Sequence, residues 1–194
     1  LLRTLLAKRG IIDENQAEIF LNPEYKRDLH DPFLMRDMEK ACIRLFEAIE
    51  KKEKIVIYAD YDCDGIPGAV IMQDLFKKIK YIKYEIYIPQ RNSEGYGLNL
   101  EAIEQFIEKK VKLLITIDLG ITAIEEIAQA KKYNIDVIIT DHHLPKYKIE
   151  NVKNSLFSLP SAYAILNPKV DNYPEKMLCG AGVVFKFVQG FIKK

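Results

Sequence analysis

Carboxylates are concentrated where Asp60, Asp62 and Asp64 stand at alternate positions. They follow an apolar run, Lys54–Ala59, that predicts a buried strand, and they precede Pro67, which suits the first turn of a helix. Three carboxylates this close repel one another unless a cation binds between them. The favoured interpretation is a metal site at the carboxyl end of a strand, the edge where open parallel α/β sheets bind ligands.

The same aspartates match the first half of an EF-hand calcium loop. The last position of that loop supplies a bidentate Glu, and here Ile71 occupies it. An EF-hand also needs a helix before the loop, whereas a strand is predicted there. A calcium loop of this kind is disfavoured, and a solvated acidic turn without a metal is the alternative that these residues alone leave open.

Similar residues follow two later apolar runs. Asp118 comes directly after one of them, and Asp141, His142 and His143 come directly after another. The carboxyl ends of parallel strands lie at one edge of a sheet, so these side chains meet in one pocket if the strands are neighbours.

Carboxylate together with imidazole is the ligand mixture that suits Mn²⁺, Zn²⁺ or Fe, while Mg²⁺ and Ca²⁺ favour sites built of oxygen. Several aspartates are available, so a pair of metal ions sharing one bridging carboxylate fits the pattern. Such a pair orients a water molecule and stabilises the oxygens at phosphorus. Hydrolysis of a phosphate ester is the chemistry that this set of residues suits best.

Two glycine-containing segments are candidates for phosphate binding. Gly180 and Gly182 lie at the start of the last helical pattern, where backbone N–H groups favour an anion. Arg91 lies in a loop that ends at Gly97, near the acidic residues, and its guanidinium suits phosphate. Close helix packing and an ordinary turn are the respective alternatives.

The chain pattern from residue 54 onward alternates between strand and helix, which predicts an α/β fold with an open, mostly parallel sheet and helices on both faces. The expected strands cover 54–59, 83–88, 112–117, 135–140 and 163–166, and the expected helices cover 67–80, 100–110, 123–133 and 181–192. Residues 1–53 hold no strand pattern and predict a helical lead-in, with helices over 1–8, 14–21 and 38–51. The predicted domains are therefore 1–53 and 54–194.

Composition favours a protein that works inside the cell. The chain has 194 residues, 48% of them hydrophobic, and a net charge of +1, which neither demands nor excludes nucleic acid. It has no apolar run long enough to span a bilayer and no signal-peptide pattern. The three cysteines form no C-x-x-C pair, which fits reduced thiols. We expect a cytoplasmic protein that does not bind membranes.

In chain order, the aspartate cluster, Asp118-x-Gly120, Asp141-His142-His143 and Gly180-x-Gly182 resemble the successive motifs of the DHH phosphoesterases. Within that superfamily the chain is similar to the RecJ-like single-strand-specific exonucleases, and the likeness spans almost all of its length. The resemblance implies a metal-dependent phosphodiesterase that degrades single-stranded DNA in the 5′-to-3′ direction and releases mononucleotides in DNA repair and recombination.

The resemblance also implies which residues bind metal. Asp62 and Asp64 would be metal ligands. Asp60 would be either a further ligand or a residue that contacts a ligand without binding the metal itself. Asp118 would bridge two metal ions, and His142 would supply the imidazole ligand. The expected cofactor is two ions of Mn²⁺, with Mg²⁺ as a substitute.

Two further residues receive roles from the same resemblance. His143 would contact the scissile phosphate and stabilise its developing charge. Asp141 would orient a histidine. The implied nucleophile is a metal-bound water.

Three features depart from the pattern that the resemblance implies. Tyr58 stands where several relatives have a histidine, and Leu119 stands where a small or polar residue is usual. The family also supplies one more metal-binding aspartate and further C-terminal domains, and the sequence ends at Lys194 before reaching them. We therefore expect residues 54–194 to be a DHH phosphoesterase domain truncated at its C-terminal end. Alone, the chain of residues 1–194 should bind metal weakly and have little activity.

Two other functions compete with this one. The first is a small-substrate DHH phosphoesterase that hydrolyses short oligonucleotides or cyclic dinucleotides. The second is a catalytically silent DHH scaffold that binds DNA or replication and repair proteins. Retention of mutually repelling carboxylates argues against the scaffold, because binding alone does not require them.

Overall fold

The computed structural model describes residues 1–147 and 157–194, which form two units, Leu1–Asp31 and Pro32–Lys194. The first unit contains three short helices, α1 (Leu2–Ala7), α2 (Glu14–Leu21) and α3 (Tyr25–Asp28). As the sequence predicts, Asp13 caps α2, because its carboxylate accepts a hydrogen bond from the Gln16 backbone N–H at 3.0 Å.

The second unit contains the predicted α/β pattern. Its elements are η1 (Pro32–Leu34), α4 (Met38–Glu50), β1 (Ile55–Ala59), α5 (Gly65–Lys78), β2 (Tyr84–Tyr87), α6 (Leu100–Glu108), β3 (Leu113–Ile117), α7 (Ile124–Lys132), β4 (Asp136–Thr140), β5 (Lys146–Tyr147), β6 (Phe157–Ser158), β7 (Ala164–Leu166) and α8 (Gly180–Lys193). A two-stranded antiparallel sheet, β5 with β6, has no counterpart among the expected strands. Within the described residues, no helix is both long and apolar enough to cross a membrane.

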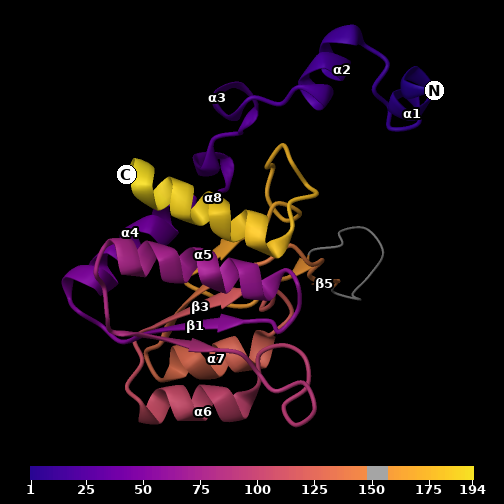
Figure 1. Cartoon of the computed structure of the whole chain (residues 1–194). Coiled ribbons are helices and arrows are strands. Elements are labelled where there is room, and N and C mark those ends of the chain that lie inside the picture. The colour runs from indigo at the N-terminus through magenta and orange to yellow at the C-terminus, as the bar shows by residue number, and fades with distance from the viewer. Residues whose placement is uncertain (148–156) are drawn as a thin grey trace. The chain divides into compact units, whose positions relative to one another are not determined.

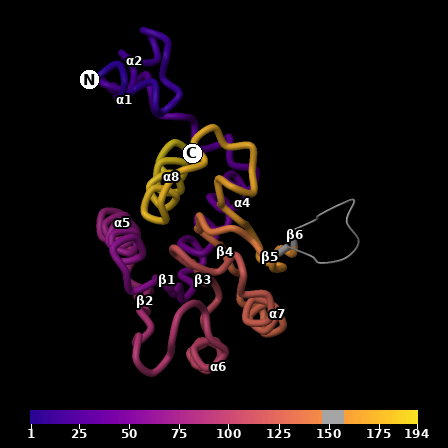
Figure 2. Tube along the Cα trace, turned by 90° about the vertical axis from the view of Figure 1, so that its right-hand side faces the viewer, coloured from indigo at the N-terminus to yellow at the C-terminus, as the bar shows by residue number. Residues whose placement is uncertain are grey.

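The main sheet has five strands in the order β2-β1-β3-β4-β7, and every neighbouring pair is parallel. Figure 2 shows β2, β1, β3 and β4 following one another across the unit. The predicted fold class is confirmed. The strands that carry the acidic residues, β1, β3 and β4, are direct neighbours, which is the condition for their side chains to meet.

Helices cover both faces of this sheet, as predicted (Figure 1). On one face, side chains of β1 such as Ile57 pack with Leu45 of α4, Phe76 of α5 and Phe187 of α8. On the other face, Val56 packs in a second apolar cluster that includes residues of α6 and α7. Both faces of the central strands are therefore buried, which explains their uninterrupted apolar runs.

Two boundaries differ from the expected ones. Helix α5 begins at Gly65, before Pro67, because the Asp62 carboxylate accepts hydrogen bonds from the backbone N–H groups of Asp64 and Gly65, which stabilises an earlier helix start. The predicted domain boundary at 53/54 separates α4 from the sheet on which α4 packs, whereas the chain divides at 31/32. The boundary at 53/54 stays a prediction, which a deletion experiment can test.

Candidate metal centre

The backbone of the sheet aligns three aspartates at one edge. Each of them follows the last residue of its strand and extends the parallel ladder by one hydrogen bond to the neighbouring strand. The backbone donor and acceptor pairs are Asp60 to Ile117, Asp118 to Thr140 and Asp141 to Leu166, at 3.2, 2.9 and 3.1 Å. The sheet register therefore places the three residues side by side.

Asp118 lies at the centre of this edge, on β3. It is 1% exposed, its backbone has a left-handed φ of +62°, and its side-chain oxygen Oδ1 has no hydrogen-bond partner among the described residues. Burial, followed by the charges of Asp64 and Asp62, raises the pKa of Asp118 to about 7. A buried carboxylate with a strained backbone and an oxygen that accepts no hydrogen bond is suited to binding a cation.

Asp62 and Asp64 come from the loop between β1 and α5. Hydrogen bonds from the backbone N–H groups of Gly65 and Asp64 lower the pKa of Asp62. Burial acts to raise the pKa of Asp64, but the backbone N–H of Ala181 and other hydrogen bonds lower it overall. The ionised form is therefore favoured for both of these carboxylates. Asp60 differs from them: it is 2% exposed, and burial raises its pKa.

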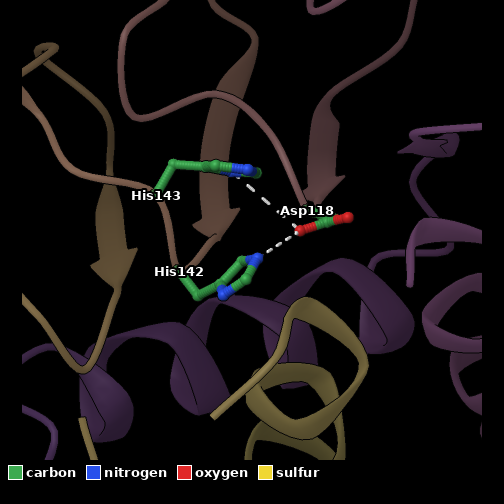
Figure 3. Close-up of side chains that lie close together, drawn as sticks. All are labelled: Asp118, His142 and His143. Atoms are coloured by element: carbon green, nitrogen blue, oxygen red, sulfur yellow. Dashed lines mark ion pairs between the residues drawn. The ribbon is translucent and has the colours of Figure 1, made fainter. Parts of the chain in front are cut away.

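The two histidines approach Asp118 from the loop after β4. The Nε2 atom of His142 lies 3.1 Å from Asp118 Oδ1 and 3.6 Å from Asp64 Oδ2, and His143 Nδ1 lies 4.0 Å from Asp118 Oδ1. Figure 3 shows both rings directed toward Asp118. Burial, followed by the neighbouring charge of His143, lowers the pKa of His142, so a neutral imidazole able to bind metal is favoured.

Asp141 is buried and holds the second histidine. One of its oxygens, Oδ1, lies 2.8 Å from His143 Nδ1 and accepts the backbone N–H groups of His142 and His143 at 2.7 and 3.0 Å. Its other oxygen accepts the backbone N–H of Ile121 at 2.9 Å. The hydrogen bond to Asp141 raises the pKa of His143 above its ordinary value. Asp141 therefore orients an imidazole, and its position fits the role that the resemblance implies.

Two sets of side chains could each hold a cation: Asp118 with His142 and His143, and Asp60 with Asp62 and Asp118. In each set, one ligand atom per residue lies within 4.8 Å of the others. Asp118 belongs to both sets, and its role as a bridge between two ions stays a prediction. The donor set of carboxylate oxygen and imidazole nitrogen fits Mn²⁺.

The remaining predicted residues belong to neither candidate ligand set, and their predicted roles are not tested by the structure. Asp64 belongs to neither set, and its oxygens accept the backbone N–H groups of Gly180 and Ala181 at 2.6 and 2.8 Å. Its role as a ligand and the phosphate contacts of Gly180 and Gly182 stay predictions. The guanidinium of Arg91 lies over the ring of Tyr61, 5.5 Å from its centroid, and its phosphate contact also stays a prediction.

A cavity of about 710 Å³ adjoins the centre on the His143 side. Tyr96 lines it, and its ring meets that of His143 edge to face at 6.4 Å between centroids. The loop that contains Tyr96 is recognisable from the sequence as a candidate for phosphate binding, but Tyr96 itself is not. An aromatic residue between two glycines has no local signature of a contact with a distant histidine.

Residues 54–194 match the model of the DHH family, N-terminal domain. The chain is 39% identical to the single-stranded-DNA-specific exonuclease RecJ of Bacillus subtilis, over 99% of this chain and 23% of that protein. It is 30% identical to RecJ of Escherichia coli, over 95% of this chain and 30% of that protein. The chain thus spans less than a third of the length of these relatives.

Solved structures agree with the sequence comparison. The crystal structure of exonuclease RecJ bound to manganese matches 82% of this chain and 38% of that chain, with a TM-score of 0.69 and 27% identity. RecJ from Thermus thermophilus in complex with Mn²⁺ shares the fold, with a TM-score of 0.72 over 97% of this chain and 24% of that chain, at 24% identity. The resemblance predicted from the motifs is confirmed.

Proposed function

The chain belongs to the DHH family, and from that premise we propose that the protein is a metal-dependent phosphodiesterase, a 5′-to-3′ exonuclease on single-stranded DNA that releases mononucleotides. One observation carries the proposal: two ligand sets, each of three side chains, share the buried carboxylate of Asp118, whose Oδ1 atom accepts no hydrogen bond among the described residues. The RecJ relatives are single-stranded-DNA-specific exonucleases, which supports the choice of single-stranded DNA. Such a substrate would place the protein in the cytoplasm, in DNA repair and recombination.

Two divalent ions fit the centre, with Mn²⁺ favoured and Mg²⁺ as a substitute. Asp60, Asp62 and Asp118 would hold one, Asp118 and His142 would hold the other, and Asp64 would be a further ligand of the pair. When bound, the ions would supply an activated water and stabilise negative charge on the phosphate. A manganese-bound RecJ relative supports the metal.

The protein's own residues would position the phosphodiester. His143, with a pKa raised by Asp141, would be protonated more often than a free histidine and would donate to a phosphate oxygen as charge develops. Asp141 would keep that ring in place through its hydrogen bond at 2.8 Å. Arg91, at the same edge of the sheet, would bind a neighbouring phosphate.

The test uses the full-length natural protein with Mn²⁺ and single-stranded DNA labelled separately at each end. We expect early loss of the 5′ label as mononucleotide. Asp118→Asn should reduce the rate by at least about a hundredfold, because a shared ligand is lost. Asp74→Asn removes an equal charge from an exposed position on α5 and should leave the rate unchanged.

Other results would redirect the proposal. Early loss of the 3′ label would overturn the polarity. Hydrolysis of dinucleotides without cleavage of long DNA would move the protein to the small-substrate branch of the family. An inert protein whose DNA binding survives Asp118→Asn would be a scaffold.

A further inference from the structure

Tyr58 lies on β1 and is fully buried, although its side chain ends in a polar hydroxyl. Its ring stacks on that of Tyr87 at 5.1 Å and meets the edge of Phe106 at 6.2 Å between centroids. These contacts fix the ring on the sheet face that α6 covers. They also direct the hydroxyl toward the segment that joins β2 to α6.

The hydroxyl is satisfied on both sides. It donates to the backbone carbonyl of Gly97 at 2.9 Å and accepts from the side-chain amide of Asn99 at 3.1 Å. The amide oxygen of Asn99 accepts the backbone N–H of Ala102 at 2.7 Å and so caps α6. Tyr58 therefore joins β1 to the loop before α6 and to the residue that begins that helix.

A second connection holds the same loop from β2. The carboxylate of Glu94 accepts a hydrogen bond from the hydroxyl of Tyr87 and another from the backbone N–H of Gln90, at 2.7 Å for the latter. Tyr87 also stacks on Tyr58. The loop of residues 90–97 is thus attached at Glu94 and at Gly97, and both attachments pass through a pair of stacked tyrosines.

The loop carries two side chains that face the metal centre. Arg91 lies over Tyr61, the residue between Asp60 and Asp62, at 5.5 Å from the ring centroid. Tyr96 packs edge to face against His143 at 6.4 Å and lines the cavity of about 710 Å³.

The conformation of the loop depends on glycine. Gly95 and Gly97 have φ values of +77° and +89°, and no atom lies within 4 Å of a Cβ built on either. Open space around a glycine-rich backbone leaves few side-chain contacts to order it, and ordering such a backbone is costly in entropy. The partly buried hydrogen bond from Tyr58 to the Gly97 carbonyl, next to Tyr96 in the chain, therefore has a large share in deciding where Tyr96 lies.

We propose that Tyr58 is a positioning residue: its buried hydroxyl fastens the loop of residues 90–97 beside the metal centre and so places Arg91 and Tyr96 for substrate binding. The claim that Tyr58 fastens the loop does not depend on the proposed function. The claim that the loop binds substrate does rest on it. Tyr58 contacts no reacting group. Its removal should therefore weaken substrate binding and leave the metal ligands in place.

The test compares Tyr58→Phe with Tyr81→Phe in the full-length protein. Each change deletes one buried hydroxyl that donates to a backbone carbonyl, and Tyr81 donates to Glu53, away from the loop. In Tyr58→Phe we expect the amides of residues 90–99 to exchange hydrogen at least about threefold faster, because both hydrogen bonds of the hydroxyl, to Gly97 and from Asn99, are lost. We expect KM for single-stranded DNA to rise by a similar factor, with kcat and Mn²⁺ affinity within about twofold.

Tyr81→Phe should leave both the exchange of these amides and KM as in the unchanged protein. Equal exchange of the loop in the two variants would overturn the proposal, and so would faster exchange with an unchanged KM. Hydrogen exchange needs no DNA cleavage. An inactive unchanged protein would therefore overturn the proposed function, while the exchange data would still decide whether Tyr58 holds the loop.

Discussion

Asp118 combines features that are unfavourable in a protein without a bound ion. Its φ of +62° lies in the left-handed region, which costs on the order of 1 kcal/mol outside glycine, and its carboxylate is buried near two others. Because its pKa is raised, this group favours folding most below the ordinary carboxyl pKa of about 4, and that contribution is lost as the pH rises through about 7.

We predict that Asp118→Asn stabilises the metal-free protein. The amide has nearly the same shape and cannot ionise, so the gain should be on the order of 1–3 kcal/mol at about pH 8 and much smaller at about pH 4. Urea unfolding in EDTA at the two pH values measures it. Equal stability of the two proteins at the higher pH would show that Asp118 is not destabilised by its neighbours.

Gly180 gives a second prediction at the residue scale. A Cβ at this position would lie 2.5 Å from Asp118 Oδ1, while the nearest atom to a Cβ at Gly182 would be the end of the Leu178 side chain, at 3.2 Å. Gly180→Ala should therefore displace Asp118, lower the free energy of unfolding by about 1–3 kcal/mol and weaken Mn²⁺ binding at least tenfold.

Gly182→Ala is the matched control, since both glycines lie in the first turn of α8. Its unfolding free energy should change by less than about 1 kcal/mol, because alanine favours the helix and Leu178 can move. Denaturant unfolding and calorimetric titration with Mn²⁺ compare the two. A loss of Mn²⁺ affinity in both variants would point to the helix start as a whole and not to the contact with Asp118.

At the scale of elements, Arg44 links helix to sheet at the edge opposite the metal centre. From α4, its guanidinium donates to Asp136 at the start of β4 at 2.6 Å and to Glu53 at 2.7 Å. It also donates to the carbonyl of Lys112, before β3, at 3.3 Å. The Arg44 side chain is 7% exposed, so these ion pairs are shielded from water more than surface pairs are.

We predict that Arg44→Met lowers the free energy of unfolding by about 1–3 kcal/mol, because Glu53 is left without its partner in a largely buried place. Lys51→Met breaks the exposed pair with Glu47 on the same helix and should cost less than about 0.5 kcal/mol. Guanidinium chloride is a salt and would screen these ion pairs, so urea is the denaturant for this comparison. Equal losses would mean that burial does not strengthen the Arg44 pairs.

The elements themselves could be predicted because their signals are local. Apolar runs of strand length, each ending in Asp, place Asp60, Asp118 and Asp141 at strand ends whatever the order of the strands. That order could not be predicted, because β1, β3 and β4 are similar apolar runs and each suits a central position. The place of Asp118 in both candidate ligand sets follows from the order, with β3 between β1 and β4.

Contacts between residues distant in sequence were also beyond local patterns. The carboxylate of Asp64 meets the start of α8, 116 positions away, and the hydroxyl of Tyr58 meets Gly97. A sequence pattern gives the residue type at each place but not the partner that tertiary structure brings to it. The need for glycine at Gly180 has the same origin, because Asp118 occupies the space of its missing side chain.

At the scale of the whole molecule, the stability of the two units should differ. In residues 1–31 only Leu6 is buried, whereas residues 32–194 contain both large apolar clusters. We predict that a protein starting at Pro32 keeps a cooperative unfolding transition within about 1 kcal/mol of the original, since little apolar burial is lost.

A protein starting at Lys54 should not fold cooperatively, because α4 and its buried Leu45 are missing from the core. Circular dichroism during heating distinguishes the two deletions. Cooperative unfolding of residues 54–194 would instead support the domain boundary predicted from the sequence.

The parallel ladder that places the three aspartates side by side also determines when the centre forms during folding. The backbone N–H of each aspartate, Asp60, Asp118 and Asp141, donates to the neighbouring strand of the sheet. The centre therefore forms only after β1, β3, β4 and β7 have paired in the native register. Parallel pairing between distant segments is a slow step of folding. A metal ion that binds only the completed centre should therefore not increase the folding rate. Its stabilisation should appear as slower unfolding, which gives the native state a longer lifetime.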